Sequence, residues 1–311
     1  IVSPQPGPNM NFLKSTGTRP QRQSGGGPQE GLQPALYVVA TPIGNAQDIT
    51  LRALDVLGSV TAILAEDTRT TAKLLGIHGL KRPLIAVHDH NEGGIAAQIV
   101  DRIRAGEALA LVSDAGTPLV SDPGFKLVRA VIEAQLPVIP LPGPSSALAA
   151  LVLSGLPPDR FMFCGFLPPK SSARQTALEA VKAVPATLIF LEAPSRLASS
   201  LSDMATVLGS RQAAVAREIT KLYEECVRGA LSALAQTYAE KDPPKGEIVV
   251  VVGPPDESEH AMGRDLDTAL IAALKESPLG QAASDVARAL DLPRRAVYER
   301  ALVLTGKKGG A

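Results

Sequence analysis

The stretch ALALVSDAGTPLVSDPG, residues 108–124, sets small and polar residues directly after an apolar run. Ser113, Asp114 and Thr117 supply two hydroxyls and a carboxylate, and Gly116 has no Cβ to keep a ligand away from the backbone. A tight turn with helix-capping residues is the commonest explanation for such a composition. The alternative is a loop whose amides and carbonyls bind a small molecule, since the stretch is longer than a turn requires. Both interpretations stay open on the residues alone.

Two other loops carry similar chemistry. TPIGN (41–45) follows an apolar run and is typical of a turn, and LPGPSSALAAL (141–151) places Ser145 and Ser146 at the start of a helix. Such serines cap a helix, and the amides exposed there also bind anionic groups. Neither loop has the G-x-G-x-x-G spacing of a dinucleotide fingerprint or the pattern of a phosphate-binding P-loop. The residues therefore exclude both fingerprints and leave capping or ligand binding open.

Charged residues follow other apolar runs at the same kind of boundary. AEDTR (65–69) contains Asp67 and Arg69, which form an ordinary surface ion pair or place a carboxylate where it can handle a proton. VHDHNE (87–92) has two histidines but no clear third ligand, which disfavours a metal site. In the second half, LEAPSR and AREITKLYEE carry further charged residues. These charges either pair with one another to join two elements or form the floor of a cleft between domains. The residues are Glu192, Arg196, Arg217, Glu218 and Lys221.

The pattern between these loops predicts the scaffold that positions them. Short apolar runs rich in β-branched residues alternate with segments of helical periodicity, which indicates an α/β fold with βαβ units and a mostly parallel sheet. The predicted strands end in the polar loops, and in open sheets of this class ligands bind at the carboxyl ends of the strands. The five strand-like runs of the first half are ALYVVAT, VTAILAEDT, PLIAVHDH, ALALVSD and PVIPLPG.

Two Pro-Pro pairs between residues 157 and 170 break regular structure and predict a domain boundary. The last part of the chain, with a short turn before Pro293, fits a helix-turn-helix unit. Such a unit caps the protein, mediates dimerisation, or contacts nucleic acid through its local excess of Lys and Arg. The predicted organisation is a disordered leader at 1–34, an N-terminal α/β domain at 35–156, a linker at 157–170, a C-terminal α/β domain at 171–255 and a helical module at 265–304.

Composition limits the remaining classes of protein. The 311 residues carry 31 Lys and Arg against 31 Asp and Glu, so no overall charge draws the chain to nucleic acid or to a membrane. No apolar run approaches the roughly 20 residues that span a bilayer. The two cysteines, Cys164 and Cys226, fit thiols in a reducing compartment. The sequence therefore predicts a cytoplasmic protein without a membrane partner.

A series of motifs over about residues 35–255 resembles the ribosomal RNA small-subunit methyltransferase I family: ATPIGNAQDITLRAL, AEDTRTTAKLL, HDHNE, LVSDAGTPLVSDPG, PLPGPSSALAAL, FLEAPSR, AREITKLYEE and GEIVVVV. The helical tail is similar to the C-terminal helix-turn-helix of that family. The resemblance implies a two-domain tetrapyrrole-methylase-like fold of class III methyltransferases, with S-adenosyl-L-methionine as cofactor between the domains, usually in a homodimer. It also implies methylation of a cytidine 2′-hydroxyl in 16S rRNA of the small ribosomal subunit.

The resemblance also implies site residues. Asp67 matches the catalytic carboxylate of the fold and is expected to accept or orient the hydroxyl proton, while Arg69 and Lys221 hold phosphate or ribose. No metal is expected. Phosphate contacts are expected from the basic tail, at Arg294, Arg295 and Arg300. Matching positions place the cofactor against Ile43, Gly44, Ala115, Gly116, Thr117, Val120, Ser145, Ser146, Leu191, Glu192, Ala216, Arg217, Gly246 and Glu247.

Two alternative functions stay open at this stage. The first is a tetrapyrrole methylase, which shares the fold and typically carries Gly-x-Gly-Pro-Gly-Asp in its first loop and Gly-Asp-Pro in the later one. This chain has ATPIGN and GTP (116–118) at those places, which argues against a corrinoid or porphyrinoid substrate. The second is a non-enzymatic helix-turn-helix protein that binds nucleic acid, which would leave most of the chain without a purpose.

Overall fold

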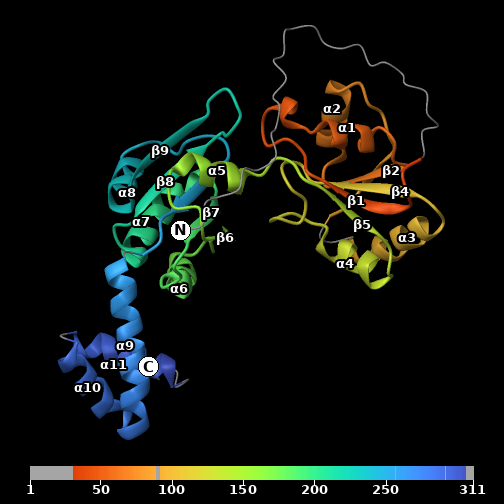
Figure 1. Ribbon diagram of the computed structural model, residues 1–311. Coiled ribbons are helices and arrows are strands. Elements are labelled where there is room, and N and C mark those ends of the chain that lie inside the picture. The colour runs from red at the N-terminus through yellow and green to blue at the C-terminus, as the bar shows by residue number, and fades with distance from the viewer. Residues whose placement is uncertain (1–30, 89–91, 256, 291, 306–311) are drawn as a thin grey trace, which may run out of the picture.

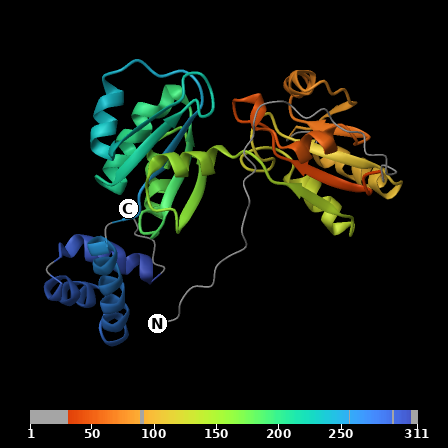
Figure 2. The same cartoon turned by 45° about the horizontal axis from the view of Figure 1, so that its top comes forward.

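The computed structural model describes residues 31–88, 92–255, 257–290 and 292–305, and it contains two α/β domains and a helical module (Figure 1). Side chains are described over the same ranges except for 257–265. Apart from residues 31–34, the predicted leader lies outside the described residues. The two domains lie side by side, and both views show the segment after β5 crossing from one to the other (Figures 1 and 2). The helical module lies next to the second domain, away from the first.

The first domain is an open parallel sheet covered by helices. Its elements are β1 Ala35–Val39, α1 Leu51–Leu57, β2 Ala62–Ala65, α2 Thr68–Ile77, β3 Leu84–Ala86, α3 Glu92–Arg104, β4 Ala108–Val112, α4 Phe125–Glu133 and β5 Val138–Leu141. The strand order is β3-β2-β4-β1-β5, with all neighbouring pairs parallel. One face packs a core around Leu57 and Ile63, and the other packs a core around Leu64 and Leu127. The predicted parallel βαβ arrangement is confirmed, because strands buried on both faces carry aliphatic side chains in both directions.

The second domain has a mixed sheet, in the order β6-β7-β10-β8-β9. Only β6 and β7 are parallel, and the other neighbouring pairs are antiparallel. Helices α6, α7 and α8 cover one face, with Leu178, Leu201 and Leu234 in the core against Phe190. The elements are β6 Phe161–Phe166, α6 Ser171–Val181, β7 Thr187–Glu192, α7 Leu197–Leu208, β8 Gln212–Arg217, β9 Glu225–Ala230, α8 Leu231–Ala239 and β10 Ile248–Val252.

Helix α5, Ser146–Ser154, lies on the other face of the second sheet, although the predicted boundary places it in the N-terminal domain. Its residues Ala150 and Leu151 share a core with Ile189 and Val249 of the second sheet. Nearly every residue of this helix is apolar, so it has no single face that marks where it packs. The chain thus crosses between domains before Ser146.

The predicted linker, residues 157–170, contains strand β6 rather than irregular chain alone. The proline pairs lie just outside the strand, at 157–158 and 168–169, where they delimit it without removing hydrogen bonds from its interior. At the edge of the sheet, β6 pairs only with β7 and has a bulge between Phe163 and Gly165. The second domain therefore begins earlier in the chain than the prolines predict.

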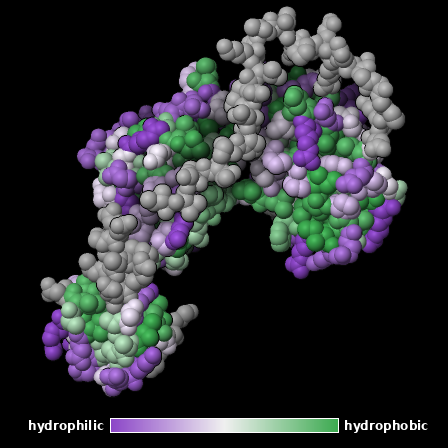
Figure 3. Space-filling model, in the orientation of Figure 1, coloured by the Kyte–Doolittle hydropathy of each residue, from purple (hydrophilic) through white to green (hydrophobic). Residues whose placement is uncertain are grey.

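Three helices form the C-terminal module, as the sequence predicts. They are α9 Glu257–Glu276, α10 Leu279–Ala289 and α11 Arg294–Leu304, so the first begins before the predicted start at residue 265. Leu270, Val286 and Val297 meet in a small separate core. Among the described residues, no helix has the length and apolar character that a membrane crossing needs. The first domain exposes apolar residues near α4 and β5 (Figure 3). Two of these exposed residues, Phe125 and Ile132, belong to α4.

A buried ion pair joins α6 to α7 in the second domain. The Arg174 guanidinium donates to Asp203 over 2.6 Å, and Ser171 and Gln175 donate to the same carboxylate over 2.9 and 2.7 Å. Only 4% of the Arg174 side chain is exposed. Burial raises the pKa of Asp203, but the hydrogen bonds from Gln175, Arg174 and Ser171 outweigh it and hold this pKa below its ordinary value. The carboxylate therefore stabilises the fold in its charged form.

We predict that Asp203→Ala lowers the free energy of unfolding by about 3 kcal/mol, because it leaves the Arg174 charge buried without its counter-ion. Urea denaturation measures this loss. Since the pKa of Asp203 is depressed in the folded state, its contribution is complete above the unfolded pKa and disappears as the pH falls through the folded pKa. The paired replacement Arg174→Met with Asp203→Leu should recover most of the stability, and no recovery would contradict this explanation.

Candidate active site

Backbone hydrogen bonds join the polar loops at the carboxyl edge of the first sheet. The Thr41 amide donates to the Gly116 carbonyl over 2.8 Å, and the Gly116 amide donates back to Thr41 over 3.0 Å. The Thr41 hydroxyl also donates to the Ser113 carbonyl, and the Thr117 hydroxyl donates to Pro144 over 3.2 Å. Gly116 has a φ of 80°, a conformation that suits a residue without a Cβ. The loops after β1, β4 and β5 thus form one connected surface.

Asp67 connects the loop after β2 to the same surface, because its amide donates to the Asp114 carboxylate over 3.0 Å. The Asp67 carboxylate caps α2 and accepts two bonds from the Arg69 guanidinium, at 3.1 and 2.8 Å. Hydrogen bonds from the Arg69 side chain and amide hold the pKa of Asp67 well below its ordinary range. A carboxylate with so low a pKa orients a donor well but takes up a proton poorly.

The second sheet presents its own edge to these loops. Ile248 of β10 is paired with Glu192 of β7 on one side and with Arg217 of β8 on the other. The ends of β7 and β8 and the start of β10 therefore lie together. The predicted cofactor residues at this edge, although far apart in sequence, are Leu191, Glu192, Ala216, Arg217, Gly246 and Glu247.

Lys221 lies where the two domains meet. Its ammonium group donates to Glu218 and to Glu247, each over 2.8 Å, so its charge is balanced within the second domain. Burial lowers the pKa of Lys221, but the hydrogen bonds that its ammonium group donates to Glu218 and Glu247 outweigh this effect and raise the pKa overall. Lys221 therefore remains charged, and the two carboxylates fix its position.

Gly44 allows the domains to approach closely. A Cβ at this position would lie 2.5 Å from Cγ of Lys221, 2.8 Å from the Thr220 hydroxyl oxygen and 2.9 Å from the Ile219 carbonyl oxygen. The next residue, Asn45, donates its amide to the Thr220 hydroxyl over 3.0 Å. The absence of a side chain at residue 44 is thus required by the neighbouring domain.

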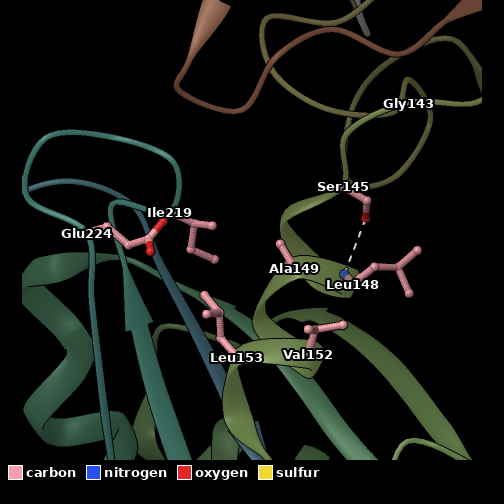
Figure 4. Close-up of a pocket in the computed structure, with 8 residues that line it drawn as sticks. All are labelled: Gly143, Ser145, Leu148, Ala149, Val152, Leu153, Ile219 and Glu224. Carbon is pink, nitrogen blue, oxygen red and sulfur yellow. Dashed lines mark hydrogen bonds between the residues drawn. The ribbon is translucent and has the colours of Figure 1, made fainter. Parts of the chain in front are cut away.

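Two cavities open along this contact. The first, here called the crevice cavity, has a volume of about 340 Å³. It is bounded by the loops after β1 and β4, by one side of α2, and by Lys221 and Glu247. The second, here called the α5 cavity, has a volume of about 450 Å³ and lies between α5 and the loop at 218–224 (Figure 4). Figure 4 shows Ala149 and Leu153 on the side of the helix toward Ile219 and Glu224.

The structure brings part of the predicted site into these cavities. The crevice cavity contains Ile43, Gly44, Ala115, Lys221 and Glu247, and the α5 cavity contains Ser145, which caps α5. Asp67 and Arg69 line neither, although α2 contributes Thr70, Thr71 and Lys73 to the crevice cavity. The other predicted cofactor residues also lie outside both linings: Gly116, Thr117, Val120, Ser146, Leu191, Glu192, Ala216, Arg217 and Gly246.

Several of these residues have clear structural roles. Glu192 is buried and binds the Ser200 hydroxyl and the Arg196 guanidinium. Arg217 donates to Glu225 over 2.7 Å. Gly246 has a φ of 98°, and a Cβ there would collide with the Glu218 side chain. Their contact with a cofactor stays a prediction.

Asp122 and Asp114 were not among the predicted site residues, although both belong to the motif that opens the sequence analysis. Asp114 lines the crevice cavity. Burial, together with the negative charge of Asp114, raises the pKa of Asp122 above its ordinary value, despite a hydrogen bond from the Ser113 side chain. The edge of the first sheet therefore carries one carboxylate whose pKa is lowered, Asp67, and one whose pKa is raised, Asp122.

The three arginines predicted to contact RNA differ in their surroundings. Arg300 donates to both oxygens of Asp267, at 2.7 and 2.6 Å, and so joins α11 to α9. Arg295 is 92% exposed and pairs with Glu299, and Arg294 is the first residue of α11. Among the side chains that the structure describes, no three His, Cys, Asp or Glu residues are grouped as a metal ion requires, and His90 lies outside the described residues.

Comparison with known proteins gives consistent matches. Residues 35–235 match the family described as Tetrapyrrole (Corrin/Porphyrin) Methylases, and residues 260–305 match the RsmI C-terminal HTH domain. The protein named "Ribosomal RNA small subunit methyltransferase I" from Mesorhizobium japonicum is 50% identical over 91% of this chain and 96% of its own length. The protein of the same name from Escherichia coli O157:H7 is 46% identical over 88% and 96%.

Solved structures share the fold. Uroporphyrin-III C-methyl transferase from Thermus thermophilus, complexed with S-adenyl homocysteine, aligns with a TM-score of 0.50 at 21% identity, over 70% of this chain and 97% of that one. Diphthine synthase aligns with a TM-score of 0.55 at 14% identity, over 70% and 90%. At these identities the alignments establish the common two-domain architecture.

We predict that Gly44→Val weakens the contact between the domains, because the added side chain meets Lys221 and the Ile219 carbonyl. The free energy of unfolding should fall by about 1–3 kcal/mol, the usual cost of overpacking. Hydrogen exchange at the Asn45 amide should accelerate, since its acceptor is Thr220.

Gly76→Ala in α2 is the matched control, because a Cβ there has nothing within 4 Å. This change should leave exchange at Asn45 unaltered and stabilise the helix by about 0.5–1 kcal/mol. Unchanged exchange in Gly44→Val would show that the domains do not rely on this contact.

Proposed function

The chain belongs to the ribosomal RNA small subunit methyltransferase I family within the tetrapyrrole methylases, and we propose that it transfers a methyl group from S-adenosyl-L-methionine to a cytidine 2′-hydroxyl of 16S rRNA. The observation that supports this most directly is the meeting of the polar loops of both domains around the crevice cavity. Cavities of this size commonly hold small ligands. The further proposals are that the substrate is the small ribosomal subunit, that the enzyme is a homodimer, and that it works in the cytoplasm.

The residues of the crevice cavity fit this cofactor chemically. S-adenosyl-L-methionine carries positive charge on its sulfonium and its amino group, and the carboxylates of Asp114 and Glu247 lie in the cavity wall. Ile43 and Leu74 supply apolar surface, while Gly44 and Ala115 leave backbone groups accessible beside them. We propose that the remaining predicted residues, from both sheet edges, complete the binding surface.

The chemistry requires alignment and the removal of one proton. When bound, the cofactor supplies a methyl group on positively charged sulfur, which is already a good leaving group. The protein has to place the ribose oxygen in line with that methyl group. Asp67, fixed by Arg69, is suited to orient the hydroxyl, and the Lys221 ammonium group, held between Glu218 and Glu247, is suited to donate to a ribose oxygen. Asp67 stays a proposed group for accepting or orienting the hydroxyl proton, and we propose Asp122 as a further acceptor, because burial raises its pKa and it lies beside Ser113 and Asp114, which line the crevice cavity.

RNA binding is proposed for the helical module. Arg294 and Arg295 at the start of α11 remain good phosphate contacts. Arg300 contributes less to phosphate binding, because its Nε and Nη2 groups already donate to the two carboxylate oxygens of Asp267. The tetrapyrrole alternative is not favoured, since curated relatives over most of the chain carry the ribosomal name. A non-enzymatic protein is not favoured either, since most of the chain matches a methylase family.

The proposed function predicts that 16S rRNA from cells without this protein lacks one 2′-O-methylated cytidine. Mass-spectrometric mapping of the RNA measures this, and expression of the wild-type chain should restore the methyl group. An unchanged methylation map, or a loss confined to tetrapyrrole products, would refute the proposal.

Asp122→Asn should lower kcat by about 10²–10⁴-fold, the usual contribution of a positioned base. In the wild type, the rate should fall as the pH drops through the raised pKa of Asp122, because the carboxylate must be ionised to accept a proton. That acid limb should disappear in the variant. Calorimetry should show unchanged cofactor binding, which separates lost chemistry from lost folding. A wild-type rate and pH profile in Asp122→Asn would rule out this role.

A further inference from the structure

Bulky apolar side chains are exposed on two segments that contribute to the lining of the crevice cavity, helix α2 and the loop that carries Lys221. Ile77, at the end of α2, lines the cavity and is 67% exposed. Leu222 and Tyr223, which directly follow Lys221, are 87% and 70% exposed. The mechanism above uses none of these three residues. Exposed apolar residues gathered beside a cavity often mark a surface that another molecule covers.

The loop that carries Leu222 and Tyr223 has a defined conformation. It connects β8 to β9, whose pairing keeps Arg217 opposite Glu225. Within it, the Thr220 amide donates to the Glu224 carboxylate over 2.6 Å, and the Lys221 amide donates to the Glu218 carbonyl over 2.9 Å. Together with the interdomain bond to Asn45, these bonds hold the two apolar residues toward solvent.

Glu218 and Thr220 adopt left-handed φ angles of 51° and 65° in this loop. Non-glycine residues rarely adopt this conformation, and where they do it often belongs to a functional segment. In the same loop, Lys221 is paired with two carboxylates and Tyr223 is exposed.

The charges around the loop indicate which part of an RNA it suits. Glu218, Glu224, Glu225 and Glu247 surround it, and the nearby cations Lys221 and Arg217 are already paired with three of these carboxylates. A phosphate group would meet repulsion here. The neutral face of a nucleobase would not, and aromatic side chains that stack on unpaired bases are a common means of RNA recognition.

We infer that Tyr223, with Leu222 and Ile77, forms a nucleobase-binding rim that stacks an unpaired base of the substrate RNA at the mouth of the crevice cavity. This inference rests on the proposed function. Stacking next to the cavity holds the nucleotide so that its ribose reaches the reacting groups. Lys73, which lines the cavity from α2, is placed to meet the phosphate of the same nucleotide.

The test compares Tyr223→Ala and Tyr223→Phe in methylation of purified small ribosomal subunits. Tyr223→Ala should raise KM about 5- to 150-fold, the range for loss of one stacked base. Tyr223→Phe should restore KM, because the ring and not the hydroxyl stacks. Ile132→Ala, which removes an exposed apolar side chain from α4, should leave KM unchanged. Calorimetry with S-adenosyl-L-methionine checks that each variant is folded and binds cofactor.

An unchanged KM in Tyr223→Ala would overturn the inference while leaving the proposed function intact. So would a change in molar mass by light scattering, which would show that Tyr223 lies in a contact between protein chains. If the wild-type protein itself fails to methylate small subunits, the proposed function falls, and the rim with it.

Discussion

The two backbone hydrogen bonds between Thr41 and Gly116 are the constraint on which the site depends. The polar loops of the first domain have no regular structure to satisfy their amides and carbonyls, and an unpaired buried backbone group is costly. The reciprocal bonds satisfy two such pairs and fix the loop after β1 against the loop after β4. Three further contacts start from the same loops: Thr117 donates to the loop after β5, Asp114 accepts from the Asp67 amide, and Gly44 lies against the second domain.

The charge of Lys221, near the contact between the two domains, is paired with charges of opposite sign. A lysine beside a backbone from another domain would be unfavourable if its charge were unpaired, and Glu218 and Glu247 compensate it from the same domain. The first domain uses a different arrangement, in which Arg69 stabilises Asp67 as a carboxylate while Asp122 is half-buried near the charge of Asp114. Two carboxylates on one sheet edge thus acquire opposite tendencies toward protons from their neighbours alone.

Much of the first domain could be predicted from the sequence, because buried strands such as ALALV are aliphatic on both faces and the helices between them keep a helical period. The position of α5 could not, since a helix apolar on nearly all sides does not indicate which sheet it covers. Of the candidate site, the polar loops were identifiable from Gly, Ser and Asp clusters. The partners of Lys221 and Arg300 were not, because Glu247 and Asp267 lie 26 and 33 residues away in the chain. The sequence did not single out Asp122, the acceptor proposed above, because Ser-Asp-Pro also fits an ordinary turn.

The loop at 218–224 is a hairpin connection whose two ends are fixed by strand pairing inside the second sheet. Its tip contributes nothing to the packing of either hydrophobic interior, since Leu222 and Tyr223 project into solvent. Residues at this tip can therefore change during evolution without loss of folding. A change of residue at this tip thus alters the surface beside the crevice cavity and leaves the two hydrophobic interiors as they are.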